Sequence, residues 1–323
     1  MKKFLTRLIL FFAGFLLVFI SVAKFDNVAR CQNKNDNVKK LVCQQNFDSL
    51  DIVFLGNSYC YSGINPIYFD SAGIKTFNLG VSTAGVNYYS VLINDYLKSA
   101  KQKPKSIFLL VSPMTLSEKT DDALNNPIYR YTNHPLSVEE YMFLHDPSLI
   151  KSYPKIIARS FSRTFVNLYT YFTSKQNYCD KGENEMFASK GFISSSKKSS
   201  FKDELKTNRF FLPFLKSQFD TVKAKKFLDL ASELEGKNIK VVFYELPSNK
   251  LYSFFNATYL HDYASFITKL KQNHNFIFVD LKLKSDYYRD QDHLNADGAT
   301  IASKEIIKQI KERKDLCELY PTQ

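Results

Sequence analysis

The sequence predicts an α/β protein with a doubly wound parallel sheet of five strands, a helical insertion and an apolar N-terminal segment. Short apolar runs rich in β-branched and aromatic residues alternate with longer stretches of helical periodicity, and one long segment interrupts this alternation. A strand, helix, strand order requires crossover connections, so the strands should be parallel and covered by helices on both faces. With 323 residues, 45% hydrophobic and 24% charged, the chain has a globular composition.

The first three strands are predicted at residues 50–55, 74–79 and 106–111, where apolar runs end at turn residues. Between the second and third, apolar side chains recur at helical spacing over residues 86–97, and Pro104 follows as a stop signal. The alternation resumes later in the chain. There we predict helices at 221–235, 259–272 and 296–311 and strands at 239–246 and 276–281.

The N-terminus predicts export. Lys2, Lys3 and Arg7 precede an uncharged apolar run from Leu8 to Ala23, which is close to the roughly 20 residues of a bilayer span. A retained signal anchor over residues 1–24 and a cleaved signal peptide both fit, and a buried core helix is a third alternative. On either leading prediction the polar residues 25–48 form a stalk, and an α/β domain at 49–323 lies on the periplasmic or extracellular side.

Residues 113–215 lack the alternation and are predicted to form an inserted, partly helical cap. Their aromatic side chains either line a sugar or acyl site or form core, and the second is the more common use of such residues. The aromatic residues considered for this role are Tyr129, Tyr131, Tyr141 and Phe143.

Charge and cysteines narrow the possible partners. The formal net charge of +12 fits a protein that is attracted to anionic lipid or glycan, and it equally fits a lysine-rich surface that is merely solvated. Nucleic acid is not expected as a partner, because the chain is predicted to be exported and its lysines are scattered. The five cysteines show no C-x-x-C spacing, so a zinc or thioredoxin-like site has no support. No metal and no other cofactor is expected. Cys31 and Cys43 could form a disulfide or remain thiols.

A serine and a histidine follow two of the predicted strands. Gly56-Asn57-Ser58 comes directly after the first strand, where a glycine permits a sharp turn that exposes a hydroxyl. Asp290-Gln291-Asp292-His293 comes after the last strand, and Asn295 beside it would cap the final helix. Since carboxyl ends of parallel strands share one edge of a sheet, the two stretches should meet there.

A serine needs a base, and the base needs an acid on its other ring nitrogen. We predict Ser58 as nucleophile, His293 as base and Asp290 as orienting acid, because a residue three positions earlier in a turn can curl back. Asp292 is the second choice, since the side chain of an adjacent residue should diverge. Cys60 as a thiol nucleophile is disfavoured because small buried cysteines are common.

These motifs resemble those of SGNH, or GDSL-like, hydrolases, whose fold is flavodoxin-like. Gly56-Asn57-Ser58 is similar to the first block of that family, residues 77–82 (FNLGVS) to the second, and Asp290 to His293 to the last. The resemblance covers about residues 50–112 and 219–311. It implies an oxyanion hole formed by the backbone N–H groups of Ser58 and Gly80.

The chain departs from the family's third block, a Gly-x-Asn-Asp whose asparagine completes the oxyanion hole. Ser112-Pro113-Met114-Thr115 stands at that place, and Asn125 or Asn126 are possible substitutes. Loss of one such donor can lower the rate roughly 10²- to 10³-fold.

This departure and the N-terminal segment are similar to the membrane-tethered branch of the family, which works in O-acetylation of exported polysaccharides and D-alanylation of teichoic acids beside a multi-span membrane acyltransferase. The resemblance implies a serine esterase or O-acyltransferase acting on acyl, most simply acetyl, esters of a cell-envelope glycan through an acyl-serine intermediate. The alternative is a catalytically silent relative that binds glycan or scaffolds an export complex. A binder of small phosphorylated ligands is disfavoured, because no glycine-rich loop follows the first strand.

Overall fold

The computed structural model describes residues 3–8, 10–11, 14, 49–81, 84–118, 188–198, 212–248, 250–290 and 292–320. The chain divides into two compact units, and one of them comprises Lys39–Asn126 and Glu185–Gln323. This α/β unit contains all the strands described below. The other unit, residues 1–38 and 127–184, lies almost wholly outside the described residues.

The sheet has five parallel strands, as the sequence predicts. The strands are β1 (Ile52–Leu55), β2 (Thr76–Asn78), β3 (Ser106–Leu110), β4 (Lys240–Glu245) and β5 (Asn275–Phe278), in the order β2-β1-β3-β4-β5. Every neighbouring pair is parallel. This is the doubly wound order of flavodoxin-like proteins, in which the chain reverses its direction across the sheet between β1 and β3. A crevice for ligands is expected at the carboxyl ends of those two strands.

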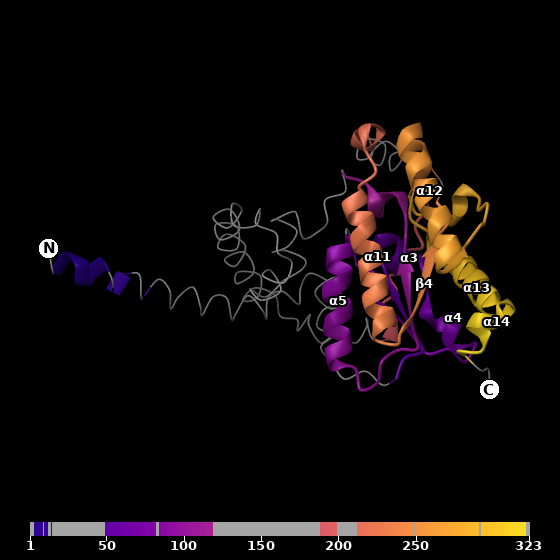
Figure 1. Cartoon of the computed structure of the whole chain (residues 1–323), viewed down its shortest axis with the longest axis horizontal. Helices are drawn as coiled ribbons and strands as arrows, with labels where there is room; N and C mark the ends of the chain where they lie inside the picture. Colours follow the sequence, from indigo (N-terminus) through magenta and orange to yellow (C-terminus); the bar gives the residue numbers. More distant parts are fainter. Residues whose placement is uncertain are drawn as a thin grey trace. The chain divides into compact units, whose positions relative to one another are not determined.

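Helices cover both faces of the sheet (Figure 1). The short helices α3 (Ser58–Gly63) and α4 (Pro66–Asp70) link β1 to β2 and pack against α13 (Ala296–Glu312). Helix α5 (Val86–Ser99) lies beside α11 (Thr221–Gly236), as Figure 1 also shows. Helix α12 (Ala257–Asn273) links β4 to β5, and α14 (Lys314–Cys317) follows α13. Since right-handed crossovers alternate faces when the strand order reverses, this distribution follows from the topology.

The core lies around the central strands. All four residues of β1 are fully buried, and no residue of β3 is more than 1% exposed. Strands with helices on both faces need apolar side chains in both directions, which explains why β1 and, after Ser106, β3 are apolar runs without alternation. The carboxyl ends of β1 and β3 are therefore held rigidly in place.

The predicted insertion begins and ends at one paired stem. The 3₁₀ turns η2 (Pro113–Leu116) and η3 (Leu212–Lys216) lie at its two ends, and Ser117 forms an antiparallel bridge with Phe219. The backbone N–H of Glu118 donates to the carbonyl of Gln218 at 3.1 Å. Because the two ends meet, a long segment can be inserted here without disturbing the sheet. The four aromatic residues proposed for a sugar or acyl site lie outside the described residues.

Residues 188–198 of the predicted cap pack against the sheet unit. The N–H of Asn78 donates to Lys190 O at 2.9 Å, and the N–H of Ile193 donates to Tyr61 O at 2.9 Å. Gly191 has φ +84°, and a Cβ there would lie 2.0 Å from Asn78 O. Glycine is needed at this position for both reasons. This stretch therefore buttresses β2 and α3, an arrangement that the sequence did not predict.

Among the described residues, no helix is both long and apolar enough to cross a membrane. Most of the run from Leu8 to Ala23, and all of the stalk, lie outside the part that the structure describes. The anchor and the export of the chain accordingly stay predictions. So does a disulfide between Cys31 and Cys43, which also lie outside it.

Candidate active site

Ser58 lies at the carboxyl end of β1, where a sharp turn leads into α3. The side chain of Asn57 caps that helix by accepting a hydrogen bond from Tyr59 N at 3.0 Å. Gly56 permits the turn, because a Cβ there would lie 2.6 Å from Cys60 Cβ and 2.8 Å from Leu110 Cβ. As the first residue of α3, Ser58 has a backbone N–H with no acceptor inside the helix.

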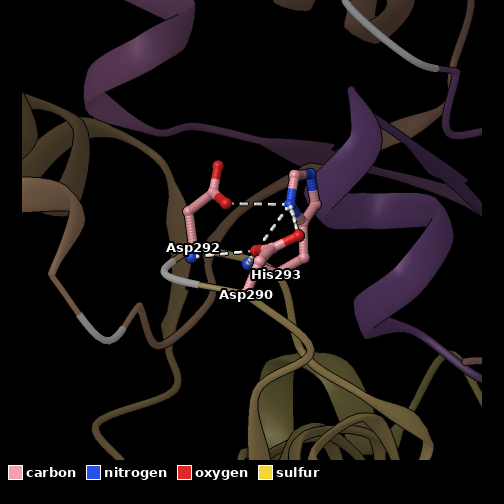
Figure 2. Close-up of side chains that lie close together, drawn as sticks. All are labelled: Asp290, Asp292 and His293. Atoms are coloured by element: carbon pink, nitrogen blue, oxygen red, sulfur yellow. Dashed lines mark hydrogen bonds and ion pairs between the residues drawn. The ribbon is translucent and has the colours of Figure 1, made fainter. Parts of the chain in front are cut away.

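The loop before α13 presents His293. Asp290 Oδ1 accepts the backbone N–H groups of Asp292 at 3.1 Å and His293 at 2.8 Å, which curls the loop tightly. The same carboxylate lies 3.0 Å and 3.1 Å from His293 Nδ1 through its two oxygens. Figure 2 shows these contacts. Asn295 caps α13 by accepting from Asp297 N and Gly298 N, as predicted.

The structure brings the two distant stretches together. His293 Nε2 lies 2.7 Å from Ser58 Oγ, and its Nδ1 contacts Asp290 on the other side of the ring. A serine hydroxyl, an imidazole and a carboxylate therefore stand in the order nucleophile, base and acid. This is the arrangement in which an imidazole can accept the serine proton while a carboxylate stabilises the resulting charge.

The expectation that the side chain of Asp292 diverges from His293 is wrong. Asp292 Oδ1 lies 2.9 Å from His293 Nδ1, as close as Asp290 (Figure 2). Two contacts turn it inward: its own N–H is held by Asp290 Oδ1, and its Oδ2 accepts the hydroxyl of Tyr59 at 2.7 Å. Spacing along the chain does not reveal a partner that lies 233 positions away.

Tyr59 and Arg289 are site residues that sequence reasoning missed. The Tyr59 ring stacks on the His293 ring, with centroids 4.9 Å apart and planes 26° apart. Arg289 Nε lies 3.3 Å from Asp290 Oδ2. Both residues are direct neighbours of predicted ones, Ser58 and Asp290. That adjacency is the one signal in the sequence that could have pointed to them.

Electrostatics favour the protonated imidazole. Burial alone would lower the pKa of His293, but the carboxylates of Asp292 and Asp290 outweigh it and raise that pKa to about 9. Burial acts against ionisation of Asp290 too, yet its hydrogen bond to His293 lowers its pKa. The pKa of Asp292 is raised, chiefly by burial and despite the nearby imidazole. Asp290 is therefore held strongly in its charged form, and negative charge on Asp292 favours the imidazolium of His293.

Gly80 occupies the expected place beside the serine turn. A Cβ there would lie 2.5 Å from Tyr61 N and 2.7 Å from Cys60 Cβ, so no side chain fits. The N–H of Gly80 donates to Asn78 Oδ1 at 2.9 Å. That this N–H also donates to an oxyanion stays a prediction. Ser112, at the place of the missing asparagine, caps η2 by accepting from Thr115 N. Asn125 and Asn126 lie outside the described residues.

Cys60, the alternative nucleophile that the sequence disfavours, lies in the core of the protein. Cys60 is fully buried, and its thiol donates to Asn78 Oδ1 at 3.2 Å, so it points into the core.

Asp290, Asp292 and His293 also have the composition of a metal-binding cluster, with one atom of each within 4.8 Å of the others. In the structure, Ser58 and the two carboxylates contact both ring nitrogens of His293.

A cavity borders the site at the ends of β3 and β4. It is small and partly open to solvent, and Tyr59, Asp292 and Glu245 are among its lining residues. Burial raises the pKa of Glu245, although the hydroxyls of Tyr252 and Tyr263 donate to it and act in the opposite direction. Two buried carboxyl groups thus face one small space beside the imidazole.

The fold and the site together define a doubly wound α/β protein with a Ser-His-Asp arrangement of the serine-hydrolase type. No family model and no curated protein matches the chain.

The solved structures that it resembles are distant. A structure from Streptococcus pneumonia that is described as a platelet activating factor is 11% identical to this chain, with a TM-score of 0.41. The match covers 92% of this chain and 98% of that one. A GDSL-like lipase from Bacteroides thetaiotaomicron VPI-5482 is 11% identical, with a TM-score of 0.38, covering 81% and 87%. A catalytic mutant of an acetylxylan esterase from Geobacillus stearothermophilus is also 11% identical, with a TM-score of 0.38, covering 82% and 94%.

Proposed function

We propose that this protein is a serine esterase or acyl hydrolase that acts through an acyl-Ser58 intermediate. The observation that carries the proposal is the 2.7 Å contact between Ser58 Oγ and His293 Nε2, with Asp290 on the opposite ring nitrogen. Ser58 and His293 are 235 positions apart in the sequence, and the fold does not require their side chains to meet at the carboxyl end of the sheet. Nucleophilic catalysis requires that they do.

The chemistry follows from these contacts. Ser58 Oγ attacks the ester carbonyl as His293 Nε2 takes its proton, and a tetrahedral oxyanion forms. The carbonyl then re-forms, the alcohol leaves with the proton that His293 returns, and the acyl group remains on Ser58. Water, or the hydroxyl of an acceptor, attacks this acyl-serine while His293 takes its proton. The bond from the acyl carbon to Ser58 Oγ then breaks, His293 returns the proton to Ser58 Oγ, and the carboxylic acid or the new ester leaves. Asp290 stabilises the imidazolium in both halves.

A finer proposal concerns the substrate. We propose an acyl ester of a cell-envelope glycan, most simply an acetyl ester, with transfer to a glycan hydroxyl as the alternative to hydrolysis. The motif resemblance, the apolar N-terminus and the net charge of +12 support it. On this proposal the N-terminal segment holds the domain at the membrane, facing the periplasm or the extracellular side, where a multi-span acyltransferase would be its partner.

The test uses the full chain with a fluorophosphonate probe and a p-nitrophenyl acetate assay. We expect the probe to label Ser58, and Ser58→Ala or His293→Gln to lower kcat by about 10⁴-fold or more. Ser90→Ala is the matched control, because within the described part of the chain the hydroxyl of Ser90 on α5 donates to Val86 O of its own helix. Folded wild-type protein that neither takes the label nor cleaves the ester would leave the silent glycan-binding or scaffold protein as the better description.

A further inference from the structure

His293 has one more partner than a triad needs. A neutral imidazole carries a single proton on Nδ1, yet two carboxylates lie within 3.1 Å of that nitrogen. Asp290 is also bound by two backbone N–H groups and by Arg289, so the loop itself orients it. Asp292 has a different anchor, the hydroxyl of Tyr59.

Tyr59 connects the base to the nucleophile. It directly follows Ser58 in α3, only 8% of its surface is exposed, and it contacts both His293 and Asp292. Its ring covers a face of the imidazole, while its hydroxyl reaches past the ring to the carboxylate. The turn that presents the serine therefore also limits how the imidazole can tilt. A bonded and stacked ring loses the freedom to rotate away from Ser58.

We propose that Tyr59 and Asp292 form a positioning pair for His293, in which Asp292 binds Nδ1 beside Asp290 and Tyr59 holds both that carboxylate and the plane of the ring. The inference rests on the proposed function, since it needs His293 as the base for Ser58. Asp292 and Tyr59 act through His293 and not on the substrate, so they are positioning residues.

Tyr59 and Asp292 also affect the pH range in which His293 is uncharged and can act as a base. The charge of Asp292 is the strongest influence that raises the pKa of His293 to about 9, ahead of Asp290. The hydroxyl of Tyr59 stays protonated, because burial and then Asp292 raise its pKa, and it remains a donor to that carboxylate. The other titratable groups around the cluster are Arg289, which pairs with Asp290, Tyr61, which contacts Arg289, and Glu245 and Tyr252, which line the cavity with Asp292.

Removing either member should therefore change both rate and pH dependence. We expect Asp292→Asn to lower kcat/KM on the high-pH plateau by about 10- to 100-fold and Tyr59→Phe by about 3- to 10-fold. In both variants the acid limb should move from near 9 toward the ordinary imidazole value of about 6.5, further for Asp292→Asn. The variant that carries both substitutions should have a kcat/KM within about twofold of that of Asp292→Asn alone, because Tyr59 acts through Asp292.

Two matched variants serve as controls. Tyr263→Phe also removes a buried tyrosine hydroxyl that donates to a carboxylate, at 2.8 Å from Glu245. Asp51→Asn also removes a negative charge, at the opposite end of β1, where Asp51 pairs with Lys105 at 2.7 Å. Both should leave the acid limb of kcat/KM in place.

A second measurement is independent of turnover. The His293 ring can be titrated by NMR in the full chain, with its signal assigned by its loss in His293→Gln. An unchanged His293 titration in both Asp292→Asn and Tyr59→Phe would overturn the inference, whatever their rates. If the wild type shows no label and no ester cleavage, the proposed function fails and the catalytic part of the inference with it. A lowered titration midpoint would then still establish the pairing.

Discussion

The side chain of Asn78 should contribute strongly to the stability of the serine turn, and its removal tests how the site is built. Asn78 ends β2 and is fully buried. Its Nδ2 donates to Cys60 O and Ile64 O, both at 2.8 Å. Its Oδ1 accepts from Gly80 N at 2.9 Å and from the Cys60 thiol at 3.2 Å. One amide therefore ties the loop after β2 to helix α3.

The magnitude follows from these bonds. In Asn78→Ala the Ile64 carbonyl and the Gly80 N–H lose this buried partner, and each such loss costs about 1–3 kcal/mol. The Cys60 carbonyl still accepts from Ile64 N at 3.1 Å, so it contributes little. We expect the free energy of unfolding to fall by about 4 kcal/mol, including the space left by the amide.

Urea denaturation followed by circular dichroism measures this change. The comparison is Asn65→Ala, because Asn65 makes one exposed capping bond to Ile67 N at 3.1 Å, and its loss should cost about 1 kcal/mol. If Asn78→Ala costs no more than Asn65→Ala, the network around Asn78 does not stabilise the turn and the reasoning is wrong. Fluorophosphonate labelling of Asn78→Ala should fall with it, because the orientation of α3 and Ser58 depends on these bonds.

Three further results are expected. His293 accepts a proton only when it is uncharged, and its pKa is raised to about 9, so wild-type kcat/KM should rise with pH through that value; a limb near 6.5, seen in a pH–rate profile, would contradict the electrostatics. Asp290→Asn should lower kcat by about 10²-fold, less than the roughly 10⁴-fold known for a lone triad acid, because a second carboxylate remains on the ring; steady-state kinetics measures it. Gly80→Ala places a Cβ 2.5 Å from the backbone nitrogen of Tyr61 and should lower the free energy of unfolding by about 1–3 kcal/mol in urea denaturation. At Gly236 an added Cβ would meet nothing within 4 Å apart from the neighbouring backbone of its own helix, so Gly236→Ala should not destabilise the protein.

Local patterns in the sequence predicted the elements closely. The strand predicted at 106–111 is Ser106–Leu110, and the helix predicted at 296–311 is Ala296–Glu312 with Asn295 as its cap. Such features depend on the period of apolar residues and on short-range hydrogen bonds, and both lie within a few positions of one another. Strand ends differ by up to three residues from those predicted, because hydrogen bonding to neighbouring strands decides them.

The sequence by itself determined the parallel sheet, the place of Ser58 after the first strand, and the place of Asp290 and His293 after the last. The tertiary structure decided the remainder: the inward turn of Asp292, the stacking of Tyr59 on His293, and the bond from the Gly80 N–H to Asn78. A loop side chain has several rotamers of similar energy, and contacts with distant parts of the chain select among them. Periodicity reports which face of an element is buried, but it does not report which partner a polar atom meets there.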